Sequence, residues 1–155
     1  MNKTNVIRLL EANKVSHDIK TYEVDENDLS GTTVANKIGV SEEMVFKTLV
    51  AEGDKSGFLV FCVPVNSEIN LKKAASVSGN KKVELIPTKN LLAVTGYVRG
   101  GCSPIGMKKK YPTYIDETAQ LFDKIYFSAG IRGMQIGTHP VDLQKLTDSV
   151  LADLT

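Results

Sequence analysis

The chain has few of the residues that build disulfide frameworks and metal sites. Of its 155 residues two are cysteine and two are histidine, and tryptophan is absent. Cys62 and Cys102 are far apart and form no CxxC pair, and His17 and His139 lack the spacing of metal ligands. This composition argues against a disulfide scaffold and against a zinc site. We therefore expect a protein that uses no metal and no other cofactor.

The sequence also lacks an excess of charge and a long apolar run. A formal net charge of +1 argues against broad, non-specific binding of duplex nucleic acid, which needs many phosphate contacts. It leaves room for a short basic patch that meets the end of a nucleic acid. No apolar run is long enough to span a bilayer, and the N-terminus reads as an amphipathic helix and not as a signal peptide. We expect a cytoplasmic protein with one domain, residues 1–155.

Apolar periodicity and turn residues predict a mixed α/β domain. Expected helices follow Thr4, cover 30–38, 70–77 and 88–94, and run from Pro140 to Leu154; expected strands cover 19–24, 46–52, 58–63, 83–86, 113–116, 124–128 and 133–137. Two of these strands flank a glycine-bounded turn, which is typical of a hairpin. The connections after Asn80 are too short for a doubly wound parallel sheet. The predicted fold is a twisted, mixed, partly closed sheet flanked by helices.

The most distinctive segment is the glycine-rich stretch 97–110, which reads YVRGGCSPIGMKKK. Glycine lets a backbone approach a ligand closely and adopt positive φ, and Pro104 stiffens the loop. Such a loop can present N–H groups to an anion or to a developing oxyanion. The alternative is a tight turn between two strands. The basic runs at 72–73, 81–82 and 108–110 are either solvated faces or parts of a phosphate-binding rim.

Lys47 stands out because the strand around it is apolar. Alternation puts Lys47 on the same face as Val45 and Leu49, where a lysine is costly unless it is paired or reaches a cleft. One interpretation is a lysine at a strand end that extends to water. The other is a cation that positions a phosphate, a ribose or a carbonyl group.

Three further side chains have both a functional and a structural interpretation. Ser128 precedes a glycine-rich turn without an evident histidine to activate it, which favours a hydrogen-bonding role over a nucleophilic one. Cys102 would be a nucleophile if its surroundings lowered the pKa of its thiol, but no base is evident, which favours a small residue without chemical function. Tyr22 can hydrogen-bond or stack on a base, or be a half-buried strand residue.

Taken in order, the motifs resemble those of the YbaK family of aminoacyl-tRNA editing proteins, the free-standing relatives of the prolyl-tRNA synthetase editing domain. The matching pieces cover nearly the whole chain: 21–23, 46–49, 71–74 with 81–84, 95–98 with 100–109, and 125–133. The resemblance implies an α/β mixed, α+β-like fold around a barrel-like sheet. It also implies hydrolysis of mischarged tRNA, in the branch that removes cysteine from tRNA for proline. The implied partners are the 3′ end of Cys-tRNA(Pro) and prolyl-tRNA synthetase.

The resemblance further implies a mechanism and a set of site residues. The substrate's own thiol would attack its ester carbonyl, so that the protein needs only to orient the group and stabilise the oxyanion. The implied catalytic residues are Lys47, Gly100, Gly101 and Ser103. Lys47 would hold the terminal adenosine or its phosphate, and the loop up to Pro104 would offer main-chain N–H groups. The implied substrate-binding residues are Tyr22, Ser30, Thr48, Cys102, Pro104, Ser128, Gly130, Arg132 and Gln135.

Two positions depart from the family pattern and bear on the preferred amino acid. Ser30 stands where an aromatic residue is common, and Gln135 stands where an acid is common. Two other functions therefore stay open. One is an Ala-tRNA(Pro) deacylase that uses water, and the other is a non-catalytic module that binds tRNA ends or nucleotides.

Overall fold

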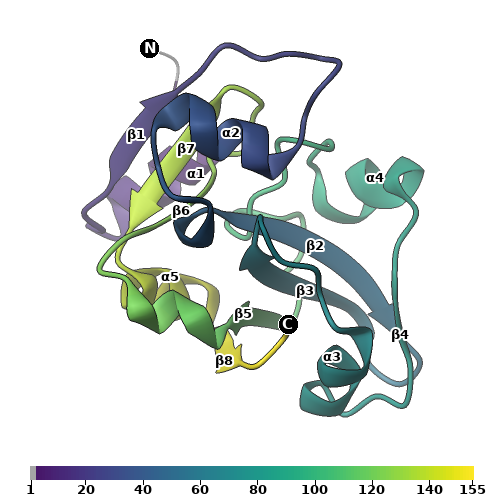
Figure 1. Cartoon of the computed structure of the whole chain (residues 1–155). Helices are drawn as coiled ribbons and strands as arrows, with labels where there is room; N and C mark the ends of the chain where they lie inside the picture. The colour runs from purple at the N-terminus through teal and green to yellow at the C-terminus, as the bar shows by residue number, and fades with distance from the viewer. Residues whose placement is uncertain (1–2) are drawn as a thin grey trace.

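The computed structural model describes residues 3–155 and contains two β-sheets (Figure 1). The three-stranded sheet has the order β1 (Asp18–Thr21), β7 (Met134–Thr138), β6 (Ile125–Ser128), and the five-stranded sheet has the order β4 (Val83–Leu85), β2 (Phe46–Gly53), β3 (Gly57–Pro64), β5 (Thr113–Asp116), β8 (Val150–Ala152). β5 pairs in parallel with β3 and with β8, and the other pairs are antiparallel. A parallel bridge between Val45 and Tyr126 joins the two sheets. The predicted mixed α/β fold is confirmed.

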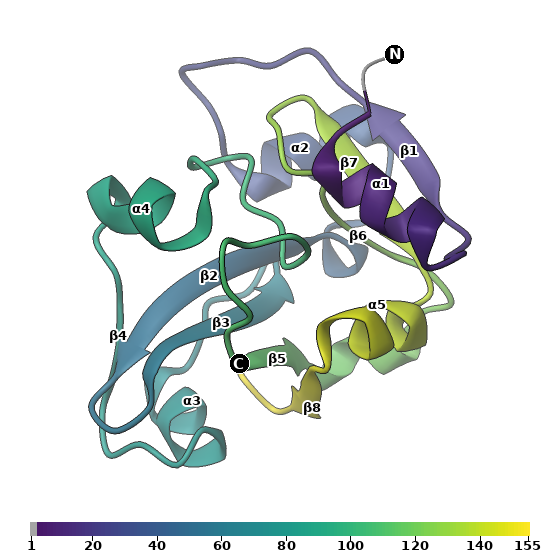
Figure 2. The same cartoon turned by 180° about the vertical axis from the view of Figure 1, so that it is seen from behind.

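Five α-helices and three short 3-10 helices connect the strands of the described chain. The α-helices are α1 (Asn5–Ala12), α2 (Gly31–Ile38), α3 (Leu71–Val77), α4 (Leu91–Thr95) and α5 (Pro140–Thr147), and the 3-10 helices are η1 (Glu42–Met44), η2 (Thr88–Asn90) and η3 (Glu117–Leu121). Figures 1 and 2 place α2 and α4 on either side of the space above β2. Across residues 3–155, no helix has the length and hydropathy that crossing a membrane requires.

Helix starts follow from local capping chemistry. The side chains of Thr4, Ser30, Asn70 and His139 each accept a hydrogen bond from a main-chain N–H in the first turn of α1, α2, α3 and α5. Such caps satisfy donors that the helix itself leaves unpaired. α2 therefore begins at a fixed residue, and this places Ser30 at the edge of the space above β2.

The prediction of one helix from Pro140 to Leu154 is wrong. α5 ends at Thr147, Asp148 adopts a φ of 50° and β8 then joins β5. Leu154 is fully buried, and its N–H donates to Asp116 Oδ1 at 2.9 Å. Val150 therefore belongs to strand β8, and Leu154 to the buried segment that follows it. A spacing of four residues between apolar side chains also fits a helix, so the sequence pattern alone could not show that the helix had ended. The first strand is also shorter than predicted, since it ends at Thr21.

β2 lies at the centre of the molecule and separates two apolar clusters. Phe46 packs into the cluster that contains β6 and β7, together with Val60 and Cys62 of β3. Ala51, on the other face of β2, packs into the cluster that contains α3. Successive side chains of a strand point to opposite faces, so Lys47 and Leu49 share the face of Ala51, and Thr48 shares the face of Phe46.

Candidate functional site

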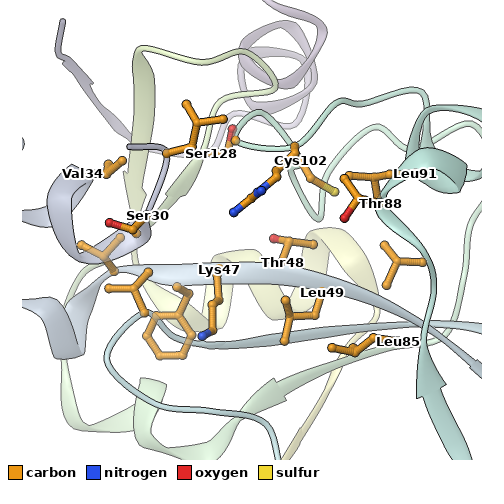
Figure 3. A pocket seen from close by; sticks show the side chains of 18 of the residues that line it. Ser30, Val34, Lys47, Thr48, Leu49, Leu85, Thr88, Leu91, Cys102 and Ser128 are labelled. Atoms are coloured by element: carbon orange, nitrogen blue, oxygen red, sulfur yellow. The ribbon is translucent and has the colours of Figure 1, made fainter. Parts of the chain in front are cut away.

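A pocket of about 340 Å³ opens along one edge of β2 (Figure 3). β2 pairs with β3 over its whole length, but it pairs with β4 only from Ala51 to Gly53. Between Phe46 and Val50, no strand of the described chain covers the second edge of β2, and this edge forms the floor of the pocket. The walls come from the start of α2, the ends of β6 and β7, the turn at 99–102 and the segment from β4 to α4.

The edge of β2 offers the pocket a main-chain donor and acceptor. Val45 O accepts from Val65 N at 2.8 Å, on the β3 side, whereas Val50 O accepts from Ile86 N at 3.0 Å, on the opposite side. Because alternate residues of a strand direct their N–H and C=O groups to alternate edges, the N–H and C=O of Thr48 point to the pocket. The site therefore contains a strand edge that can pair with a ligand.

Lys47 and Thr48 project from opposite faces of β2, one on each side of that edge (Figure 3). Lys47 is partly buried; burial lowers the pKa of its ammonium group, and the attraction of Glu68 partly offsets this shift. Among residues 3–155, no carboxylate forms an ion pair with Lys47. Its charge is thus available to an anion that enters the pocket.

The turn at Arg99–Cys102 forms the wall opposite β2. Gly100 adopts a φ of 85° and lines the pocket together with Arg99 and Cys102. In the described chain, neither the N–H of Gly100 nor that of Cys102 donates to a protein acceptor. The N–H of Arg99 likewise has no protein acceptor in the described chain, so three main-chain donors of the turn are free for a ligand.

The rest of the glycine-rich loop lies behind this wall. Gly101 N donates to Val98 O at 2.9 Å, so its N–H is already engaged. Ser103 is fully buried and its Oγ accepts from Ile105 N at 3.3 Å, while Pro104 has no N–H to offer. Gly101, Ser103 and Pro104 do not line the pocket. From these positions the three residues can stabilise the conformation of the Arg99–Cys102 turn, but they do not face a ligand in the pocket.

The Cys102 thiol is not set up as a nucleophile. Burial raises its pKa to about 12, and a hydrogen bond with Thr95 only partly counters this shift. A thiol with such a pKa stays protonated near neutral pH, and the thiolate is the reactive form. Cys102 therefore contributes its main-chain N–H and its shape to the pocket.

Three polar side chains from distant segments meet at the β6–β7 end of the pocket, which we define by Ser30, Ser128 and Gln135. Ser128 Oγ accepts from Gly130 N at 3.1 Å, and Ser128 lies opposite Gln135 in the pairing of β6 with β7. Gln135 is only 6% exposed, and its Oε1 is buried without a hydrogen-bond partner. An unpaired buried acceptor costs roughly 1–3 kcal/mol. A donor from a bound ligand would remove that cost.

Tyr22, Gly130 and Arg132 lie beside the pocket and do not line it. Tyr22 follows β1, and its N–H donates to Gly133 O at 3.0 Å. Arg132 donates from Nε to Arg99 O at 2.8 Å, and its guanidinium pairs with Glu26 at 2.6 Å. Arg132 thereby holds the Arg99–Cys102 turn in place from behind.

Histidine chemistry is absent from the pocket. His17 Nδ1 contacts Val15 O, and His139 caps α5; neither residue lines the site. In the part of the chain that the structure describes, no group of three His, Cys, Asp or Glu side chains is arranged to hold a metal ion. Ser128 accordingly has no histidine beside it to act as a general base.

The sequence analysis did not single out several residues that line the pocket: Val34, Leu49, Leu85, Ile86, Thr88, Leu91 and Arg99. Arg99 could have been predicted from the sequence, because it directly precedes the two glycines of the glycine-rich loop. The residues from 85 to 91 carry no motif. They reach the pocket only because β4 leaves β2 and continues into η2 and α4 beside it.

Comparison with known proteins identifies the family. The aminoacyl-tRNA editing domain family matches residues 29–146. The chain is 48% identical over 153 residues, which is 99% of this chain and 93% of the relative, to EbsC of Enterococcus faecalis, named as a candidate Cys-tRNA(Pro)/Cys-tRNA(Cys) deacylase.

Two solved structures show the same fold. The hypothetical protein APE2540 has a TM-score of 0.88 at 21% identity, with 97% of this chain and 99% of that chain covered. A protein described as a candidate trans-editing enzyme for prolyl tRNA synthetase has a TM-score of 0.82 at 22% identity, with 99% of both chains covered. The match across residues 29–146 and the near-full-length likeness to EbsC together confirm the predicted family: the chain belongs to the aminoacyl-tRNA editing domain family.

Proposed function

We propose that this protein is a deacylase that removes cysteine from mischarged tRNA in trans, with Cys-tRNA(Pro) as its substrate. The observation that carries the proposal is the 48% identity with EbsC over nearly the whole chain. The pocket supports it, because a cation and free main-chain groups line a cavity large enough for the end of an aminoacyl-tRNA. Editing exists where a synthetase cannot reject a near-isostere strongly enough by binding alone.

The proposed chemistry uses the thiol of the substrate. This thiol loses its proton to solvent, and the sulfur attacks the ester carbonyl carbon. The carbon–oxygen bond to the ribose then breaks, the ribose oxygen takes up a proton from water, and cysteine leaves as a cyclic thiolactone that water later opens. Such an intramolecular attack needs orientation more than it needs a protein base.

In this mechanism the turn at Gly100 and Cys102 stabilises the oxyanion. Gly100 and Cys102 line the pocket, and their N–H groups have no protein acceptor in the described chain; an oxyanion donor must be free in this way. Lys47, at the opposite wall, holds the ribose or the phosphate of the terminal adenosine. Gln135 and Ser128 hydrogen-bond the aminoacyl group at the β6–β7 end.

Prolyl-tRNA synthetase is the partner that we propose for delivery of the substrate. The net charge of +1 gives the protein little general attraction for tRNA. We therefore expect the isolated protein to bind different tRNA species with similar affinity and to take its selectivity from the synthetase. Filter binding with several tRNAs tests this, and strong discrimination by the isolated protein would count against it.

The function is tested by release of the amino acid from Cys-tRNA(Pro), Cys-tRNA(Cys) and Ala-tRNA(Pro). We expect release of cysteine from both cysteinyl substrates and little release of alanine, which has no thiol. Equal release of alanine would favour a deacylase that uses water. Binding of charged tRNA without release above the spontaneous rate would favour a non-catalytic module.

A further inference from the structure

Arg132, in the turn between β6 and β7, connects three segments that form the pocket. It donates from Nε to Arg99 O at 2.8 Å, in the turn that contains Gly100 and Cys102. Its guanidinium also pairs with Glu26 at 2.6 Å, in the segment that leads into α2. The strands on either side of Arg132 carry polar side chains of the β6–β7 end. One side chain thus joins three walls of the pocket from outside it.

The hydrogen bond to Arg99 O acts on one of the proposed oxyanion donors. The carbonyl of Arg99 and the N–H of Gly100 belong to the same peptide group, which is planar and trans. Its C=O and its N–H therefore point in opposite directions. Because Arg132 binds the oxygen and does not line the pocket, the N–H of Gly100 is directed away from Arg132, as a donor to a ligand in the pocket must be.

The charge of Arg132 also strengthens this donor. A hydrogen bond from a charged group is stronger than one between neutral groups, and it draws electron density towards the carbonyl oxygen that accepts it. The N–H at the other end of the same peptide group then becomes a better donor, because hydrogen bonds in series polarise one another. The contact from Arg132 therefore both orients and polarises the N–H of Gly100.

The two adjacent glycines let the pocket turn come this close to Arg132. A Cβ added at Gly100 would lie 3.2 Å from Arg132 Nε, and one added at Gly101 would lie 3.2 Å from the main-chain Cα and C of Ile131. A side chain at Gly101 would therefore push the two turns apart. Since the N–H of Gly101 is already engaged by Val98 O, this contact, and not an oxyanion, explains why a glycine stands there.

Glu26 holds the guanidinium from the segment before α2. That segment is fixed by Asp28, whose Oδ1 accepts from Ser30 N at 3.1 Å. The side chains of Glu26 and Arg132 are 69% and 31% exposed, and an ion pair this open to solvent contributes little by itself. The hydrogen bond to Arg99 O is therefore expected to have the larger effect on the pocket.

We propose that Arg132 is a positioning residue for deacylation, which orients and polarises the peptide group whose N–H, at Gly100, stabilises the oxyanion. It acts without touching the substrate, so it affects kcat and not substrate binding. This role differs from the substrate contact that the resemblance to the family implies for Arg132. The proposal rests on the proposed function, since that reaction supplies the oxyanion.

The test removes the Arg132 side chain and then supplies its guanidinium from solution. Arg132→Ala lacks the atoms of ethylguanidinium, which can therefore occupy the vacated space. With Cys-tRNA(Pro) we expect Arg132→Ala to lower kcat roughly ten- to a hundredfold and to leave KM within twofold. Added ethylguanidinium should restore kcat severalfold. A protein that the substitution had merely destabilised would be destabilised further by a guanidinium salt.

Three variants serve as comparisons. Lys124→Ala is the matched control, because Lys124 pairs with Asp18 at the other end of the same sheet and does not line the pocket; its kcat should stay within twofold and should not respond to ethylguanidinium. Glu26→Gln should lower kcat less than threefold, since the ion pair is exposed. Arg132→Lys keeps the aliphatic stem and the charge but has no donor at the position of Nε. It should lower kcat severalfold, and it replaces Arg132→Ala if that variant does not fold.

A spectroscopic measurement separates this inference from the proposed function. The amide ¹⁵N resonance of Gly100 reports the polarisation of its peptide group; Arg132→Ala should move it upfield, and ethylguanidinium should move it back. An unchanged resonance, a raised KM with an unchanged kcat, a loss of kcat that ethylguanidinium does not reduce, or an equal loss in Lys124→Ala would overturn the inference. If the native protein did not deacylate Cys-tRNA(Pro), the proposed function would fail, and a Gly100 resonance that moves and returns in this way would still support the action of Arg132 on the turn.

Discussion

Gln135→Met should make the protein more stable and less active. Gln135 is almost fully buried, and its Oε1 has no hydrogen-bond partner. Methionine has a similar length and no strong acceptor, so it fills the same space without an unpaired oxygen. Stability and substrate binding are then expected to move in opposite directions, because the acceptor is costly in the empty pocket and useful in the occupied one.

The size of the effect follows from the cost of an unpaired acceptor. An unsatisfied buried group costs about 1–3 kcal/mol, and part of that is regained when methionine replaces it. We expect a gain of about 1 kcal/mol in the free energy of unfolding, which corresponds to a rise of roughly 2–4 °C in Tm for a domain of this size. The lost hydrogen bond to the aminoacyl group should raise KM for Cys-tRNA(Pro) about tenfold.

Urea denaturation, thermal denaturation and deacylation kinetics measure these changes. The comparison variant is Gln135→Glu, which keeps the acceptors but adds an ionisable group. Burial should raise the pKa of the new carboxyl group in the folded state. The free energy of unfolding of Gln135→Glu should therefore be highest below about pH 4.3, the ordinary pKa of glutamate, where the new carboxyl group is protonated in both states. It should fall as the pH rises from there to the raised pKa of the folded state.

Two results would refute this reasoning about Gln135. A Tm of Gln135→Met that is equal to or below that of the native protein, with an unchanged urea m-value, would mean that Oε1 is satisfied in solution. A gain in stability with unchanged KM would mean that the acceptor does not meet the substrate.

Three further predictions concern the cation, the thiol and the entry of α2. Lys47→Met should lower kcat/KM for Cys-tRNA(Pro) roughly ten- to a hundredfold, because the nucleotide loses a hydrogen bond from a charged group. Because burial lowers the pKa of Lys47, native activity should fall as the pH rises through a value below that of an ordinary lysine, and the pH profile of Lys47→Met should lack this fall. Cys102→Ala should keep its activity within about threefold, since a thiol with a pKa of about 12 is not the nucleophile; inactivation with intact substrate binding would assign the attack to the protein. Gly31→Ala should destabilise the fold by about 1–3 kcal/mol, because an added Cβ would clash with both Cγ1 and Cβ of Val65. Val65→Gly removes both atoms, so the double variant should lose less stability than the sum of the two single variants, and additive losses would contradict the proposed clash.

The elements that the sequence predicted well are those fixed by neighbouring residues. The hairpin of β2 and β3 has its turn between Gly53 and Gly57, and α2 begins at its Ser30 cap and ends at Gly39, whose φ is 71°. Turn and cap preferences act over a few residues and can therefore be read directly. The end of α5 could not be predicted in this way, because the apolar residues after Thr147 fit both a helix and strand β8, which pairs with β5.

For the site, the sequence placed Lys47, Gly100, Ser128 and Gln135 in one functional set through the resemblance to the family, and the structure brings all four to one pocket. It could not show that the N–H of Gly101 is already engaged by Val98. Hydrogen bonding within a loop depends on its actual backbone angles, which residue types restrict but do not fix.

By itself the sequence determined the family, the mixed α/β class and two chemical features of the site, which are a lysine in an apolar strand and a glycine-rich turn. Only the tertiary structure decided where the ligand can bind. The pocket exists because β4 pairs with β2 only from Ala51 onward, which leaves Thr48 at an open edge and carries Leu85 and Thr88 beside it. That edge depends on the pairing of strands distant in sequence, and no local pattern encodes where such pairing begins.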